Sequence, residues 1–168
     1  MRKILMVIIL LLGGAFTSFA QSGYRGFADI SLGAGFNEEY GFNGMITTTH
    51  GYQCNGHIFV GGGVGFGYSS AEYCDWTGYD EYFEIGAMLP IYAALRYDYS
   101  LISRHSFFAS VRGGYETLYS GGFFAPELGV RFGSFSKISY NLSLRSDFIF
   151  GGDPEFYPTV LVSFGIEF

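Results

Sequence analysis

The chain has 168 residues, of which 15 are acidic and 9 are basic, so its formal net charge is −6 with histidine neutral. This balance argues against nucleic acid as a partner, because nucleic-acid binding needs a basic face. Aromatic residues make up 20 % of the chain, and Lys137 is the only lysine beyond residue 20. The remaining basic residues there are arginines, which suit pairing with carboxylates at enclosed sites.

Residues 1–20 have the pattern of a secretory signal peptide. Arg2 and Lys3 precede an apolar run from Ile4 to Leu12, and small residues around Ala20 mark a cleavage site. The run is too short to span a bilayer as a helix, which takes about 20 residues. We expect cleavage after Ala20 and one mature domain over residues 21–168. The residue directly after the cleavage site is Gln21 and not a cysteine, which argues against a lipoprotein.

Beyond residue 20, apolar residues recur at every second position in eight segments. A period of two is typical of a β-strand with one apolar and one polar face. In chain order, the expected strands are residues 24–36, 41–52, 57–68, 83–99, 106–115, 123–132, 138–150 and 158–168. The second has the weakest apolar face. Asn55-Gly56 is a strong hairpin signal, and the longest expected loop is Ser69 to Tyr82.

Eight strands of about 9–11 residues, with no helical segment between them, predict an all-β fold: an eight-stranded antiparallel up-and-down transmembrane β-barrel. A soluble lipocalin-like barrel with the apolar face inside would show the same alternation. The polar face argues for the membrane reading, because it holds glycine, serine and mixed charges instead of the Lys/Glu-rich surface of a soluble barrel. With the N-terminus in the periplasm, the even strand number returns Phe168 there.

The polar face therefore lines the lumen, where buried charges must be paired. An eight-stranded barrel is barely wide enough for its own side chains. We expect an ionic network to fill the lumen, with room left by Gly61, Gly63, Gly65 and Gly67 of the third strand. The predicted network comprises Arg25, Asp29, Glu84, Arg96, Asp98, Arg112, Glu116, Glu127, Arg131, Arg145, Asp147 and Glu167.

The last strand alternates to the end of the sequence, with Phe164, Ile166 and Phe168 on the lipid-facing side. A terminal Phe that closes an alternating strand resembles the C-terminal assembly signal of bacterial outer-membrane barrels. The overall strand pattern resembles that of the OmpX/OmpA-barrel-like outer-membrane proteins of Bacteroidota. Segments such as TTTHGYQCNGHIFVGGGVGFGY and LPIYAALRYDY are similar to theirs. The resemblance implies a Gram-negative outer-membrane location and contact with the barrel-assembly machinery through the last strand. It implies no defined activity, and no peptidoglycan-binding domain is expected after the barrel.

Three groups of residues suggest other chemistry. His50, Cys54 and His57 have metal-like spacing but lack a convincing fourth ligand, so no metal or other cofactor is expected. Cys54 and Cys74 should lie at opposite ends of the third strand, too far apart for a disulfide. His105-Ser106 is at the wrong end for a lipid-modifying enzyme of the outer leaflet, and no nucleophile–base pair can be assembled around it.

The sequence thus favours a monomeric structural or surface-interaction barrel without catalysis. Its expected neighbours are outer-membrane lipid and lipopolysaccharide. The acidic side chains of the outer loops are expected to be simply solvated; binding of a basic partner, or of divalent cations that would bridge the loops to lipopolysaccharide, is less favoured. Two alternatives stay open. One is a narrow channel or an accessory component of transport or secretion, and the other is a lipid A-modifying enzyme.

Overall fold

The computed structural model describes residues 23–35, 40–54, 56–74, 81–102, 105–117, 120–133, 138–150 and 157–168. The expected signal peptide lies outside these ranges, as do most residues of the acidic connections. Among the described residues, no helix is long and apolar enough to cross a membrane.

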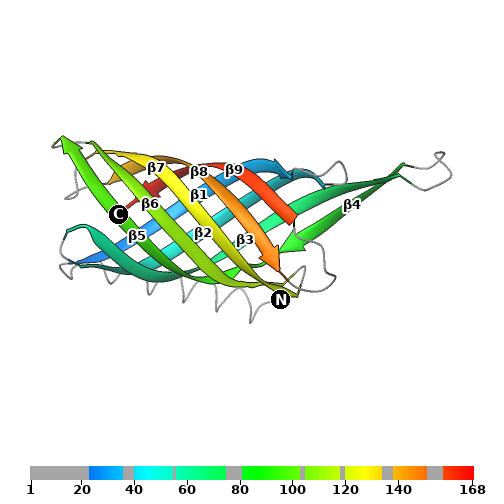
Figure 1. The fold of residues 1–168 in the computed structure, drawn as a ribbon, viewed down its shortest axis with the longest axis horizontal. Coiled ribbons are helices and arrows are strands. Elements are labelled where there is room, and N and C mark those ends of the chain that lie inside the picture. The colour runs from blue at the N-terminus through cyan, green and yellow to red at the C-terminus, as the bar shows by residue number, and fades with distance from the viewer. Residues whose placement is uncertain are drawn as a thin grey trace, which may run out of the picture.

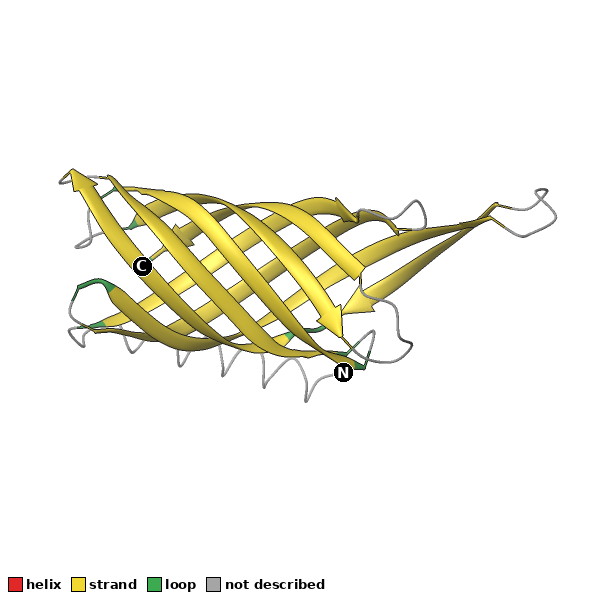
Figure 2. Ribbon diagram, in the orientation of Figure 1, coloured by secondary structure: helices red, strands yellow, loops and turns green. Residues whose placement is uncertain are grey.

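The described chain consists of strands and the turns between them (Figure 2). Their bounds are β1 Tyr24–Gly35, β2 Tyr40–Cys54, β3 Ile58–Cys74, β4 Glu81–Met88, β5 Ile91–Ile102, β6 His105–Glu116, β7 Gly121–Phe132, β8 Ser139–Phe150 and β9 Tyr157–Glu167. Each of the eight predicted segments is found, with ends shifted by a few residues because pairing continues into the turns.

The sheet closes on itself. The order is β2-β1-β9-β8-β7-β6-β5-β3-β4, and an additional β2–β3 pairing completes the ring (Figure 1). β4 and β5 both pair with β3 in one continuous register, with Gly67 opposite Met88 and Val64 opposite Ile91. β4 and β5 therefore count as one strand of the barrel wall. The barrel is a closed eight-stranded antiparallel one, as predicted.

The expected continuous strand over residues 83–99 is interrupted at Leu89 and Pro90. Proline has no backbone N–H, so it cannot donate to a neighbouring strand. The Pro90 carbonyl still accepts from the Gly65 N–H at 2.9 Å, and the Leu89 N–H donates to the Glu116 carboxylate at 3.0 Å. A side chain thus replaces one lost backbone partner, and the register continues across the break.

The expected loop from Ser69 to Tyr82 is wrong for most of its length. β3 continues to Cys74 and pairs with β4, with Ala71 opposite Glu84 and Tyr73 opposite Tyr82. Figure 1 shows β3 and β4 running together beyond the other strands, as a two-stranded ribbon. The apolar alternation stops after Tyr68 and resumes at Phe83, so the sequence pattern marked the β4 part of this ribbon but not the end of β3.

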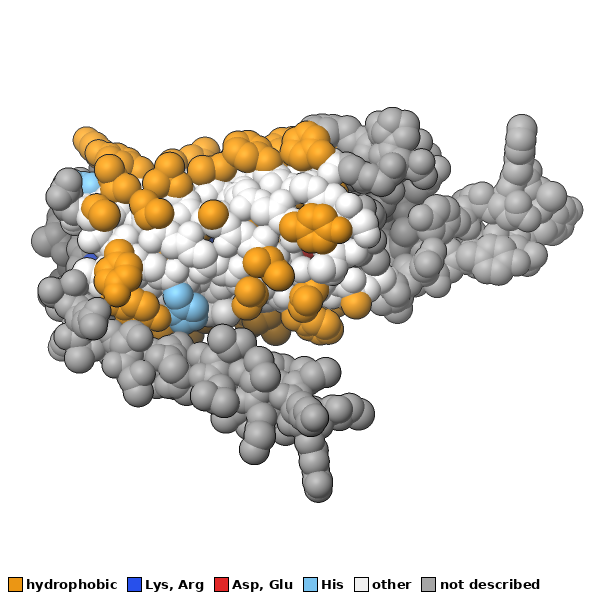
Figure 3. All heavy atoms as spheres, turned by 90° about the horizontal axis from the view of Figure 1, so that it is seen from below, with side chains coloured by type: hydrophobic (Ala, Val, Ile, Leu, Met, Phe, Trp, Pro, Cys, Tyr) orange, Lys and Arg blue, Asp and Glu red, His pale blue; other side chains and the backbone are white. Residues whose placement is uncertain are grey.

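Apolar side chains point outward and polar side chains point inward. Ile30, Phe66 and Leu128 are 54 %, 64 % and 68 % exposed, whereas Asp29 and Arg131 are only 2 % and 1 % exposed. In Figure 3 hydrophobic side chains stand along the wall, and charged ones are almost missing from that face. The arrangement is the reverse of a soluble barrel, whose apolar face would point inward.

Candidate functional site

The lumen is the part of the molecule where charged side chains gather. The described lumenal side chains include five arginines and six carboxylates, and all except Arg25 are classed as buried. They form three levels along the barrel axis. We call the end that holds Tyr24, Phe168 and the β2–β3 turn the terminus end, and the opposite end the ribbon end.

At the terminus end, Glu167 on β9 is the centre of an ionic cluster. It pairs with Arg25 on β1, with the Arg96 guanidinium on β5 at 3.5 Å and with that of Arg131 on β7 at 3.5 Å. Arg96 also binds Asp98 through two N–H groups, at 2.8 and 3.0 Å. Three arginines share two carboxylates here, so four strands are held together by one network.

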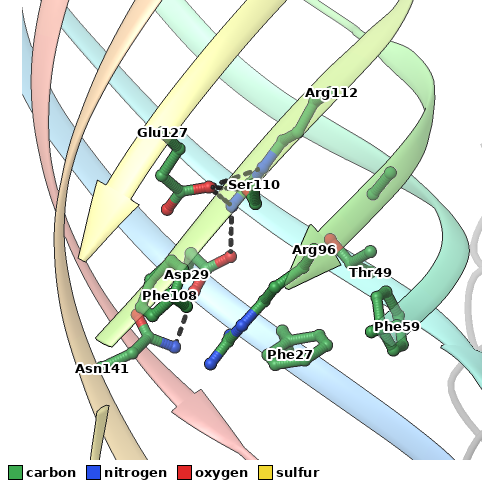
Figure 4. Close-up of a pocket in the computed structure, with 11 residues that line it drawn as sticks. Phe27, Asp29, Thr49, Phe59, Arg96, Phe108, Ser110, Arg112, Glu127 and Asn141 are labelled. Atoms are coloured by element: carbon green, nitrogen blue, oxygen red, sulfur yellow. Dashed lines mark hydrogen bonds and ion pairs between the residues drawn. The ribbon is translucent and has the colours of Figure 1, made fainter. Parts of the chain in front are cut away.

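In the middle of the lumen, Arg112 on β6 bridges two carboxylates (Figure 4). Its guanidinium donates to Glu127 at 2.9 Å and to Asp29 at 3.0 Å. Ser110 and Ser143 donate to Glu127 as well. The cluster connects β1, β6, β7 and β8, and each buried charge has an opposite charge beside it.

At the ribbon end, Arg145 and Asp147 form a pair on β8 with an Nε–Oδ1 distance of 2.8 Å. Glu116 lies on β6 and accepts from Leu89, as described above. All the predicted lumenal residues whose side chains are described therefore lie in the lumen. Glu84 belongs to β4, and its side chain is outside the described part.

Aromatic rings fill much of the space that was assigned to charges. Phe27, Phe59 and Tyr92 form a buried inner cluster. The expectation that the β3 glycines make room for the ionic network is wrong, because no charged side chain is among the nearest neighbours of any of the four; Gly65 faces Pro90 and Thr47, and Gly67 faces the Gly44 carbonyl and Met45. A Cβ on Gly61 would meet the Phe59 ring, and a Cβ on Gly63 would meet the Tyr92 ring.

These inner aromatic rings, except Tyr92, were missed because a polar-face pattern gives no sign of them. They also contact the arginines. The Arg96 guanidinium lies 3.8 Å from the Phe108 ring centroid and 4.8 Å from that of Phe27. Arg112 lies 5.5 Å from the Tyr92 ring. Such cation–π contacts stabilise a guanidinium that has left water.

Between the described side chains of the lumen lie two small cavities, each of about 20 Å³. Each has room for about one water molecule. Arg112 lines both cavities, so its guanidinium and the carboxylates that hold it lie between them. Neither of these two cavities has space for a larger ligand.

The last strand places the predicted assembly residues on the outer wall. Phe164 and Ile166 are exposed. Phe168 exchanges two backbone hydrogen bonds with Gly26, at 2.8 and 2.9 Å. A Cβ on Gly26 would fall on the Phe168 ring, and the His50 ring lies beside it at 6.3 Å. The terminal ring is thus seated on β1 at the seam where the barrel closes.

The suggested metal residues serve other contacts. His50 hydrogen-bonds to the Tyr24 hydroxyl at 2.6 Å and to Thr48 at 2.8 Å, whereas His57 bonds to the Asp98 carbonyl at 3.0 Å. Cys54 is an exposed free thiol. β3 has 17 residues, so it separates Cys54 from the Cys74 backbone by about 50 Å at 3.3 Å per residue. The two cysteines are at opposite ends, as predicted.

A closed antiparallel barrel with an apolar wall and a charged, filled lumen defines the class of transmembrane β-barrels.

No protein-family model matches the sequence, and no curated protein matches it. The fold is similar to that of Neisserial surface protein A, with a TM-score of 0.60 and 14 % identity over 87 % of this chain and 96 % of that one. A de novo designed transmembrane β-barrel gives a TM-score of 0.50 and 8 % identity over 88 % and 98 % of the two chains. The outer membrane protein Ail of Yersinia pestis gives 0.46 and 12 % over 88 % and 100 %. The chain thus has the fold of the small outer-membrane barrels.

Proposed function

We propose that this protein is a monomeric barrel of the bacterial outer membrane that has a filled lumen, no catalytic role, and a surface-interaction role carried by the β3–β4 ribbon. The fold likeness to Neisserial surface protein A supports the location. If the proposal holds, the purified protein will run faster on an SDS gel unheated than boiled, and will be recovered from the outer-membrane fraction. Recovery from the soluble fraction without a heat shift contradicts it.

A role in transport is disfavoured by the packing of the lumen. Charged networks occupy three levels, and the two cavities between them hold about one water each. Asp29 and Glu127 are also engaged by Arg112 instead of facing an open cleft, which favours a role without catalysis. We expect no steady current from the protein in a planar lipid bilayer, and a steady conductance would favour the channel alternative.

The interaction role rests on one observation, the open edge of β4. Among the described strands, β4 pairs with β3 alone. The Gly65–Pro90 bond shows which pairs of this register carry hydrogen bonds, and bonding pairs alternate in an antiparallel ladder. The N–H and C=O groups of Phe83, Ile85 and Ala87 therefore face away from β3. Such an edge can take up an extended segment of another chain as an added strand.

The chemistry of the ribbon indicates the kind of segment. Between Ser69 and Tyr92 the sequence has five acidic residues and no Lys, Arg or His. A basic extended segment would complement it. We expect a ten-residue peptide of alternating Lys and Thr to bind the protein in fluorescence anisotropy, with a Glu-for-Lys version as its control.

Ile85→Pro tests the edge, because proline removes an outward N–H without touching the donors that face β3. Peptide binding should be lost in Ile85→Pro and kept in Ile85→Val, while both variants keep the heat shift. Equal binding by Ile85→Pro and the original protein would reject strand addition at this edge.

The remaining parts of the proposal concern neighbours in the envelope. The exposed apolar wall contacts lipid, the ribbon end faces lipopolysaccharide, and β9 with Phe168 is the segment that the barrel-assembly machinery recognises. The outward position of Phe164 and Ile166 on the closing strand supports this last assignment.

A further inference from the structure

A hollow of about 510 Å³ lies in the outer wall over β5, β6 and β7. Adjacent side chains of the three paired strands form it. Its volume is within the range of small-molecule sites, about 300–1,000 Å³. It is an open depression, and the outward side chains that line it are those of Tyr97, Tyr99, Phe107, Ala109, Leu128 and Val130.

The hollow exists because one small residue stands between long ones. Ala109 on β6 faces outward, and its neighbours across the ladder are Tyr97 on β5 and Leu128 on β7. Both neighbours project from the wall, at 50 % and 68 % exposure. The next outward row, Tyr99, Phe107 and Val130, borders the hollow toward the terminus end.

The terminus end of the hollow is polar. The next outward residue after Phe107 along β6 is the exposed His105, whose ring lies 5.8 Å from that of Phe132. The His57 ring stacks on Tyr97 at 6.0 Å. The imidazoles of His57 and His105 thus lie at the terminus end of an apolar hollow that is lined by Tyr97 and Tyr99. Aromatic residues with one polar atom are typical of the level where lipid head groups meet acyl chains.

We propose that this hollow holds one acyl chain of a glycerophospholipid from the leaflet at the terminus end, with the head group beside His57 and His105. The hollow is continuous with the apolar wall, whose neighbours in a bilayer are lipid chains. A concave apolar body with polar groups at one end fits an amphiphile, whereas a second barrel would present a convex wall to it. The inference rests on the proposed membrane location.

Filling the hollow tests the proposal. The protein is reconstituted in nanodiscs of phosphatidylethanolamine and phosphatidylglycerol, released in the mass spectrometer, and measured for retained phospholipid. We expect a complex with one phospholipid per chain. Ala109→Phe, which puts a ring between Tyr97 and Leu128, should lose this peak, and Ala109→Leu should weaken it.

Ala28→Phe is the matched control, because Ala28 also faces outward but lies on β1, away from the hollow. It should keep the bound lipid. Equal retention by Ala109→Phe and the original protein, no retained lipid in either, or a dimer that Ala109→Phe abolishes would each overturn the proposal. The heat shift of all variants is read separately, so a failure of the membrane barrel itself is distinguished from a failure of the lipid site.

Discussion

At the scale of single residues, Arg112 determines how the middle of the lumen is held. Its guanidinium binds Asp29, Glu127, Thr47 and the Tyr92 hydroxyl, the last two at 3.1 and 3.4 Å. Arginine suits this position because its planar fork offers five donors in fixed directions. The side chain also lies between the two lumenal cavities, so stability and closure of the lumen depend on the same group.

Arg112→Ala should therefore destabilise the barrel, because it leaves two buried carboxylates without their cation. Breaking a buried charge pair costs about 3–5 kcal/mol. Arg112→Lys, which keeps the charge but loses the fork, should cost less. Urea unfolding in lipid vesicles, followed by the gel-mobility shift, measures both. A midpoint for Arg112→Ala that equals that of the original protein would show that the cluster does not hold the strands together.

A pair of adjacent glycines gives a second residue-scale prediction. A Cβ on Gly63 would lie 2.6 Å from the Thr48 backbone carbonyl and overlap the Tyr92 ring, whereas a Cβ on Gly62 would have only the Tyr92 carbonyl at 3.4 Å. Overpacking of this kind costs about 1–3 kcal/mol. Gly63→Ala should unfold at lower urea than the original protein, and Gly62→Ala should be close to it. The reverse order would mean that the inward side of β3 is not packed as described.

At the scale of elements, a period of two was enough to find the strands and their faces, because each strand separates lipid from lumen. The same period did not predict the interruption at Pro90, because the alternation and the pairing register continue from β4 into β5. The ribbon was missed because the apolar alternation stops after Tyr68, although β3 continues to pair with β2 as far as Ala71 and with β4 as far as Cys74. Among inner residues, the charged ones were predictable because they mark the polar face. Phe59 and Phe108 were not, because an aromatic residue that fills space in the lumen breaks the polar pattern of that face.

β9 carries an element-scale prediction about assembly. Deleting Phe168 removes two backbone hydrogen bonds to Gly26 and the ring that covers it. Each such bond contributes about 1 kcal/mol, a small part of the strand pairing of a whole barrel. We expect a lower yield of inserted barrel in the membrane fraction, with little change in the unfolding midpoint of the barrel that does insert.

Phe168→Ala and Phe132→Ala provide the matched comparison, because Phe132 is also an outward aromatic at the terminus end. Only the substitution at Phe168 should reduce the yield. Equal membrane yields from the two variants and the original protein would count against an assembly role for the terminal ring.

At the scale of the whole molecule, the barrel has two different ends. The terminus end holds the β2–β3, β5–β6 and β7–β8 connections, the start of β1 and the end of β9. The ribbon end carries the extension of β3 and β4 beyond the wall (Figure 1). If the terminus end faces the periplasm, the ribbon projects from the cell surface, where a partner segment can reach the β4 edge. The proposed interaction role therefore depends on which way the barrel is inserted.

The two cysteines measure this orientation, because they lie at opposite ends of β3. In Cys74→Ser the remaining Cys54, which is exposed at the terminus end, should resist a membrane-impermeant maleimide in intact cells and react after the outer membrane is disrupted. In Cys54→Ser the remaining Cys74 should react in intact cells, because a strand of 17 residues carries it to the other side. Labelling of Cys54 in intact cells would reverse the orientation and place the β4 edge in the periplasm.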